Sequence, residues 1–218
     1  MECIILAGGK GTRLGQGAPP KALIKVGDRT ILDHRLQYLI KQGIKRFVIA
    51  VGYKKEEVKE HVRCYYNGKA KIFFSEEDNL LGTAGAIKNA MRYVEGKGAF
   101  VTNVDDITNI DIQAFKGVSK GENTICLARF RSPYGIVKTE KGMVYDFVEK
   151  PLLTDLWASC GFYYLRRETD LPEEGSIEEE VFPYIPLRVY KHQGYWYTVN
   201  TLKDKIMVEE KIKEELLE

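Results

Sequence analysis

The sequence predicts an α/β fold in which a mixed, mostly parallel sheet is flanked by helices. Apolar runs of strand length alternate with segments of helical periodicity up to about residue 106, and a glycine-rich turn follows the first run. Shorter apolar runs fill the rest of the chain. Parallel strands need long crossover connections, which helices supply, so the alternation favours a doubly wound sheet. The shorter runs indicate a smaller antiparallel part.

The first half alternates regularly between the two kinds of element. Strands are expected at 3–7, 46–52, 71–75 and 99–104, and helices at 30–43, 55–62 and 82–94. In the first of these helices, apolar residues recur at helical spacing, with Thr30 as a candidate N-cap and Gly43 as a candidate stop.

The second half predicts short strands and one terminal helix. The strands are expected at 124–130, 134–139, 143–150, 159–165, 187–192 and 195–199, and the charged amphipathic helix from about Leu202 to Leu217. No repeat and no Pro/Gly/Ser-rich linker separates the halves. We therefore expect one domain, 1–218, with lobes of about 1–106 and 107–218.

The composition excludes several classes of protein. A net charge of +2 gives no basic face of the kind that nucleic-acid binding requires. The chain has no apolar run near the roughly 20 residues that span a bilayer, and no signal-peptide pattern, so we expect a cytoplasmic protein without a membrane partner. The four cysteines and three histidines lie at neither zinc nor redox spacing.

The stretch LAGGKGTRLG (6–15) places four glycines and two cations directly behind the first expected strand. Glycine lets backbone N–H groups approach phosphate closely at this edge of a parallel sheet, so a phosphate site is favoured over a flexible turn. A dinucleotide fingerprint starting at Gly9 fails at Leu14, and a Walker loop fails at Ile4. Neither common nucleotide motif is supported.

Together with PPKALIKVG (19–27), this loop resembles the signature of the sugar-1-phosphate nucleotidylyltransferases. Four further motifs of that family follow in order: GTAGAIKNA (82–90), VTNVDD (101–106), FVEKP (147–151) and CGFYYL (160–165). The resemblance covers nearly the whole chain. It implies a Rossmann-like sheet of the nucleotide-diphospho-sugar transferase type, with a nucleotide-binding half and a smaller antiparallel sugar-binding lobe.

The resemblance also implies a reaction. A nucleoside triphosphate and a sugar 1-phosphate give an NDP-sugar and pyrophosphate, with Mg²⁺ as cofactor and no covalent nucleophile. In such a transfer the protein positions two anions and spreads the charge of the phosphoryl oxygens. The implied catalytic residues are Arg13, Lys21, Asp105 and Lys150, with Asp105 as the metal ligand.

The binding residues divide between the two substrates. The nucleotide is expected at Leu6, Ala7, Gly8, Gly9, Gly11, Thr12, Glu77, Gly82 and Thr83. The sugar phosphate is expected at Gly135, Glu149, Lys150, Ser159 and Thr198. Lys150 is the implied partner of the phosphate, and Glu149 accepts hydrogen bonds from sugar hydroxyls.

Glu77 falls where the family places a base-reading side chain. A carboxylate accepts both the N1–H and the N2–H of guanine, whereas uracil and thymine offer a single N3–H, so GTP is favoured. The alternative is a solvated acidic loop, because Glu76 and Asp78 are acidic as well.

The chain departs from the family at the C-terminal WxDVGT motif. It reads WYTVNT here, with Thr198 at the Asp and Asn200 at the Gly, so one anionic metal ligand is missing. Val104 replaces another glycine, and an adjacent Asp106 is present. Either Asp105 with Asp106 and the substrate phosphates holds the ion, or the metal site is impaired.

The residues favour an enzyme that uses GTP with mannose 1-phosphate or a heptose 1-phosphate. Two alternatives stay open. One is a cytidylyl-, uridylyl- or thymidylyltransferase that acts on another sugar, polyol or amino-alcohol phosphate. The other is a non-catalytic subunit that binds nucleotide sugars. Members of the family often self-associate, so a homo-oligomer is also open.

Overall fold

The main sheet has seven strands, six of which run in one direction. The computed structural model describes residues 1–12 and 18–215. In spatial order the strands are β12 (Arg188–His192), β8 (Thr124–Ala128), β11 (Ala158–Arg166), β6 (Gly98–Asn103), β1 (Glu2–Leu6), β4 (Arg46–Val51) and β5 (Lys71–Glu76). Only β11 is antiparallel to its neighbours within this sheet. The predicted fold class is confirmed.

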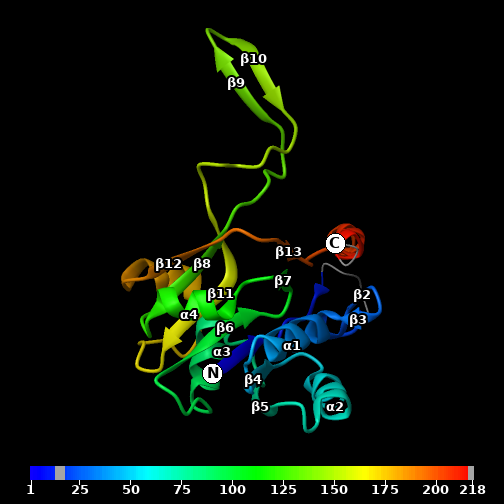
Figure 1. The fold of residues 1–218 in the computed structure, drawn as a ribbon, viewed down its shortest axis with the longest axis vertical. Helices are drawn as coiled ribbons and strands as arrows, with labels where there is room; N and C mark the ends of the chain where they lie inside the picture. Colours follow the sequence, from blue (N-terminus) through cyan, green and yellow to red (C-terminus); the bar gives the residue numbers. More distant parts are fainter. Residues whose placement is uncertain (13–17, 216–218) are drawn as a thin grey trace.

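Helices cover both faces of the sheet (Figure 1). They are α1 (Ile31–Lys41), α2 (Lys55–Tyr66), α3 (Gly82–Met91), α4 (Ile112–Ser119), α5 (Ile177–Glu180) and α6 (Leu202–Glu215), with 3₁₀ turns η2 (Lys21–Leu23) and η3 (Phe182–Tyr184). Alternate residues of β1 enter two separate cores, because successive side chains of a strand point to opposite faces. One core contains residues of α1, α2, α4 and α6, and the other contains residues of α3 and α5.

The predicted helices and strands of the first half are all present. Thr30 caps α1 as expected, and Gly43 follows the helix with φ of +89°. The sequence patterns missed α4, α5 and the short hairpin of β2 (Lys25–Val26) and β3 (Arg29–Thr30). These elements are short, so their periodicity gives little signal.

The strands of the second half belong either to the main sheet or to small two-stranded sheets. Three of them, β8, β11 and β12, extend the main sheet. The others form small antiparallel pairs: β7 (Asp106–Thr108) with β13 (Trp196–Thr198), and β9 (Ile136–Glu140) with β10 (Met143–Val148). Figure 1 shows the β9–β10 hairpin standing well clear of the body. In the part of the chain that the structure describes, no helix is long and apolar enough to cross a bilayer.

Asp33 ties the start of α1 to α2. Its carboxylate accepts hydrogen bonds from Thr30 N at 3.1 Å, from the Tyr66 hydroxyl at 2.8 Å, and lies 2.9 Å from His61 Nε2. Burial by itself would raise the pKa of Asp33, but the hydrogen bonds from His61, Thr30 and Tyr66 outweigh burial and hold this pKa well below its usual value.

We expect Asp33→Asn to lower the free energy of unfolding at pH 7 by about 1–3 kcal/mol. A depressed carboxyl pKa stabilises the fold above the ordinary Asp value and loses this contribution as the pH falls below it. The difference between the variant and the parent should therefore shrink below about pH 4. Urea unfolding of the parent and the variant at pH 7 and below about pH 4 measures this difference. Asp28→Asn is the control, because that side chain is 86% exposed, and an equal loss at both pH values would contradict the assignment.

Candidate active site

The glycine-rich loop lies at the carboxyl end of β1, packed against the end of β4. Ala7 N donates to Ala50 O at 2.8 Å, and Tyr53 N donates to Gly8 O at 3.2 Å. A side chain at Gly8 would stand 3.4 Å from Gly52 N, so the two backbones approach closely. The sequence therefore places glycine where the loop must pass over its neighbour.

Lys21 is the centre of a polar cluster beside this loop. Its Nζ lies 2.6 Å from Asp105 Oδ2 and 2.7 Å from Asn200 Oδ1. Asn200 Nδ2 in turn donates to Thr198 Oγ1 at 2.9 Å. A side chain at Gly11, whose φ is +66°, would lie 3.2 Å from Lys21 Cβ. We refer to Lys21, Asp105, Thr198 and Asn200 as the Lys21 cluster.

Three segments that are distant in sequence bring this cluster together. Lys21 begins η2, Asp105 follows β6, and Thr198 ends β13. Backbone hydrogen bonds fix the last two, because Val199 N donates to Asp105 O at 3.0 Å and Val104 N donates to Leu6 O at 3.2 Å. The side chains of Lys21 and Asp105 are only 16% and 19% exposed, so both are held in place at the sheet edge.

Glu77 faces the loop from the end of β5. A side chain at Gly8 would stand 3.1 Å from Glu77 Oε1, while Oε2 accepts a hydrogen bond from Leu81 N at 3.2 Å. Burial raises the pKa of Glu77, and the bond from Leu81 lowers it in part. The carboxylate is thus half-buried beside the loop, with one oxygen directed toward it.

Comparison with known proteins shows the family of the chain. A family model described as "Nucleotidyl transferase" matches residues 2–179. The chain belongs to the nucleotidyl transferase family. The resemblance that the sequence motifs predicted is confirmed, and the chain is a nucleotidyltransferase.

Two curated relatives of this nucleotidyltransferase differ in the base that their names state. A D-glycero-alpha-D-manno-heptose 1-phosphate guanylyltransferase of Campylobacter jejuni is 36% identical over 82% of this chain and 84% of its own length. A glucose-1-phosphate cytidylyltransferase of Salmonella typhi is 28% identical over 96% and 95%. A solved structure, HddC of Yersinia pseudotuberculosis complexed with GMP-PN, has a TM-score of 0.78 and 26% identity over 97% of this chain and 99% of its own.

Asp106 has a structural place in this nucleotidyltransferase. It is 4% exposed, and its Oδ1 accepts a hydrogen bond from Trp196 Nε1 at 2.7 Å. Burial first, and the neighbouring Asp105 second, raise the pKa of Asp106 to about 7. Of the two alternatives for the ion, the one in which Asp106 assists Asp105 gains no support from this geometry, because the Asp106 carboxylate is enclosed by Trp196 and by the backbone at Gly161.

The donors of the Lys21 cluster fit a hard divalent ion. Among the described residues there is no group of three His, Cys, Asp or Glu side chains that could hold a metal. The cluster offers the Asp105 carboxylate and two neutral oxygens, from Thr198 and Asn200. Mg²⁺ needs few protein ligands, because it keeps waters and binds substrate phosphates. The site could thus hold Mg²⁺ only with help from the substrates.

The GTAGA motif packs on the loop that precedes α5. Gly82 has φ of +71°, and a side chain there would collide with Gly175 O. Thr83 Oγ1 donates to Glu178 Oε2 at 2.9 Å, and Glu178 Oε1 accepts from the Tyr163 hydroxyl at 3.2 Å. Ser159 continues this chain of bonds, 3.2 Å from the same hydroxyl. Sequence patterns gave no role to Glu178, which stands in no motif, or to Tyr163, although Tyr163 lies within CGFYYL.

Three residues expected at the sugar lie on the β9–β10 hairpin. Gly135 immediately precedes β9, and Glu149 and Lys150 immediately follow β10. Lys150 Nζ lies 3.4 Å from Glu149 Oε1, and the two side chains are 53% and 62% exposed. The structure therefore brings these three together at the base of the β9–β10 hairpin, which Figure 1 shows standing clear of the body. Arg13 lies outside the described residues, and the role of every site residue stays a prediction.

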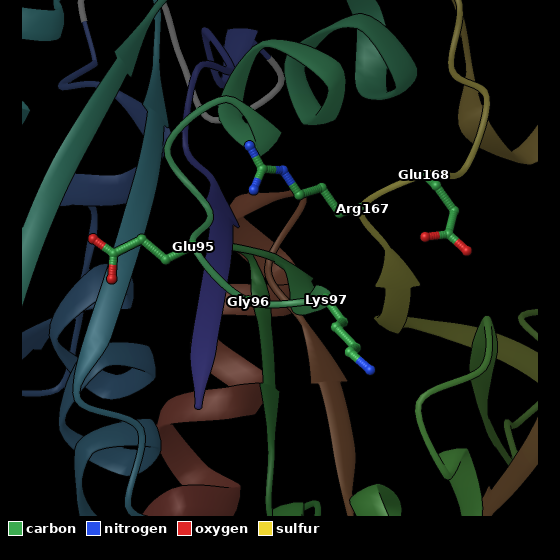
Figure 2. Close-up of a pocket in the computed structure, with 5 residues that line it drawn as sticks. All are labelled: Glu95, Gly96, Lys97, Arg167 and Glu168. Carbon is green, nitrogen blue, oxygen red and sulfur yellow. The ribbon is translucent and has the colours of Figure 1, made fainter.

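Two other hollows lie apart from this site. One is at the opposite edge of the sheet, where β6 begins, and Figure 2 shows the charged ends of its lining residues pointing apart rather than converging. The other runs between α1, the β2–β3 hairpin, β7 and α6. Arg35, which is 3% exposed and donates to Thr102 Oγ1 at 2.7 Å, lies at its wall. Neither hollow includes Lys21 or the loop.

Proposed function

We propose that this nucleotidyltransferase transfers a guanylyl group from GTP to a sugar 1-phosphate of the mannose or heptose type. The products would be a GDP-sugar and pyrophosphate. The observation that carries the proposal is the position of the Glu77 carboxylate, half-buried and directed at the glycine-rich loop. The name of the Campylobacter jejuni relative, a heptose 1-phosphate guanylyltransferase, supports it.

The loop and the Lys21 cluster supply the charge that phosphoryl transfer needs. The loop amides face the triphosphate, and Lys21 moves from Asp105 to the phosphoryl oxygens as the substrates enter. Positioning and charge compensation are the main tasks, because the attacking sugar-phosphate oxygen is already anionic. Asp105 would hold Mg²⁺, which would supply charge neutralisation for the phosphates. Arg13 adds a second cation in this proposal.

Guanine recognition follows from the chemistry of Glu77. Its raised pKa means that its ionised form is poorly solvated in the free protein. Two N–H donors of guanine replace the missing water, and an ionised acceptor makes the stronger bonds. Cytosine offers one exocyclic amine there, and uracil one ring N–H. Specificity for GTP is thus expected to depend on the negative charge of the half-buried Glu77 carboxylate.

Pyrophosphate release over a grid of nucleoside triphosphates and sugar 1-phosphates, with Mg²⁺, tests the function. Release confined to GTP supports the proposal, and release confined to CTP, UTP or dTTP replaces it with the corresponding transferase. The name of the Salmonella typhi relative makes cytidylyl transfer the first rival. Nucleotide binding without release in any combination would indicate a non-catalytic subunit.

We expect Glu77→Gln to lower kcat/KM for GTP by about 10–100-fold, because an amide offers one acceptor where the carboxylate offers two. The ratio of GTP to CTP turnover should fall with it. Asp78→Asn is the matched control, because Asp78 is 90% exposed and pairs with Lys55 on the same loop. An unchanged ratio in Glu77→Gln would show that Glu77 does not contact the base.

A further inference from the structure

The two departures from the WxDVGT motif contact each other at the Lys21 cluster. Where the motif has Asp and Gly, this chain has Thr198 and Asn200. Asn200 Oδ1 lies 2.7 Å from Lys21 Nζ, and Asn200 Nδ2 donates to Thr198 Oγ1 at 2.9 Å. One departure therefore binds the lysine of the cluster, and the other binds the first.

The hydrogen bonds of the Asn200 amide fix the direction in which it faces. A lysine ammonium has three donors and no acceptor, so only the amide oxygen can face Lys21. The amide nitrogen then points away from the ammonium, and Thr198 Oγ1 is its acceptor. A side chain without this hydroxyl would remove the acceptor, and a flipped amide would turn its own donors toward Lys21. The hydroxyl of Thr198 thus sets the orientation of the amide.

The backbone of Asn200 is held on both sides. Val199, which is fully buried, precedes it, and Val199 N donates to Asp105 O at 3.0 Å. Asp204 Oδ2 accepts hydrogen bonds from Asn200 N at 3.1 Å and from Thr201 N at 2.8 Å. Asp204 N donates in return to Thr201 Oγ1 at 3.2 Å, which is the reciprocal capping of a helix start. With the backbone fixed, the bond to Thr198 decides how the side chain points.

The charge of the Lys21 cluster is balanced. Asp105, 2.6 Å from Lys21 Nζ, is the one carboxylate among its four residues, and Thr198 and Asn200 are neutral. An Asp at position 198 would give two carboxylates against one ammonium, and so a net negative charge. Such a charge attracts a free divalent ion and repels a triphosphate. The neutral cluster therefore favours a metal ion that arrives with the nucleotide.

We propose that Thr198 and Asn200 act as one positioning unit for Lys21, in the place where the motif has a carboxylate. Thr198 orients the amide, and the amide oxygen holds Lys21 opposite Asp105 until the lysine pairs with the phosphates. Thr198, which the motifs place at the sugar phosphate, acts here through Asn200. This inference rests on the proposed function, which needs Lys21 at the phosphoryl oxygens.

A double-mutant cycle tests whether the two residues act as one unit. We expect Thr198→Val and Asn200→Ala each to lower kcat for pyrophosphate release by about 10-fold with little change in KM, because Lys21 acts on charge that develops in the transition state. The double variant should lose no more than either single variant. Thr198→Ser keeps the hydroxyl and should recover most of the loss. Multiplied losses in the double variant, or Thr198→Ser as slow as Thr198→Val, would overturn the proposal.

Mn²⁺ binding without nucleotide tests the charge balance independently of any activity. The paramagnetic resonance signal of the free ion should show that Thr198→Asp with Asn200→Gly binds Mn²⁺ at least about 10-fold more tightly than the parent. Thr198→Asp alone repeats the test without a new glycine. Asn67→Asp, at an exposed position at the end of α2, adds a negative charge elsewhere and should leave the affinity unchanged.

The Mn²⁺ titration also separates this inference from the proposed function. Parental affinity in both Thr198→Asp variants would overturn the inference, because position 198 would then not supply charge to the cluster. If no substrate pair in the grid reacts, the proposed function fails. The titration then still decides whether Thr198 and Asn200 stand in the place of a carboxylate.

Discussion

Asp105→Asn should lower kcat/KM for Mg²⁺-dependent pyrophosphate release by about 10²–10³-fold. Asp105 is the one carboxylate of the Lys21 cluster. Thr198 stands where the WxDVGT motif would place a second carboxylate. An amide keeps the shape and accepts a hydrogen bond from Lys21, but it removes the negative charge that would attract a divalent ion. The fold should persist, because the asparagine can still accept a hydrogen bond from Lys21, which also keeps its bond to Asn200.

Three measurements separate this loss from a general defect. Steady-state kinetics at several Mg²⁺ concentrations should show that excess metal restores part of the rate. Thermal unfolding should be close to that of the parent, and nucleotide binding without metal should persist. Asp170→Asn, at an exposed position outside the cluster, is the control for kinetics. Activity within about three-fold of the parent would remove Asp105 from the site.

The fold was predictable because its first half is locally consistent. In α1, the N-cap at Thr30, the apolar spacing and the stop at Gly43 agree with one another, and the helix forms where they place it. The apolar runs of β1 and β4 are buried on both faces, as parallel strands require. In the second half, composition could not tell whether a short strand joins the main sheet or a separate pair. Long-range pairing decides that, and it places β11 between β6 and β8.

The site was predictable where a motif carries both its backbone and its chemistry. The glycine-rich loop, Lys21 and Asp105 lie together as the motifs imply. Asn200 was noticed only as a departure, although it accepts a hydrogen bond from Lys21. Asp106 is adjacent to Asp105 in sequence, but Asp105 lies in the turn after β6, whereas Asp106 begins β7. One residue of the pair therefore faces the site, and the other faces Trp196.

The position of Lys150 was beyond sequence reasoning. A motif states which side chain is needed, and it does not fix where the segment that carries it lies. Here the EKP segment lies at the base of the β9–β10 hairpin, where Ser132 N donates to Pro151 O. This pairing involves two backbone hydrogen bonds and a bridge between linkers that have no sequence signature.

Gly161→Ala should lower the free energy of unfolding by about 2–5 kcal/mol. Gly161 has φ of +65°, which costs an alanine roughly 1–2 kcal/mol. The new methyl would also collide with the Asp106 carboxylate and the Asn103 amide. Neither neighbour can yield cheaply, because Asp106 is buried and bonded to Trp196.

The same substitution should also lower the rate of the reaction. Pushing Asp106 displaces β7, and Asp105 stands immediately before that strand with its carbonyl bonded to Val199. The free energy of unfolding, measured in urea, and kcat/KM should therefore both fall in Gly161→Ala. Gly117→Ala is the matched control, since a methyl there meets no atom within 4 Å and alanine favours a helix. Normal stability with normal turnover in Gly161→Ala would mean that Asp106 can shift without moving Asp105, and that the buried carboxylate does not hold the site in place.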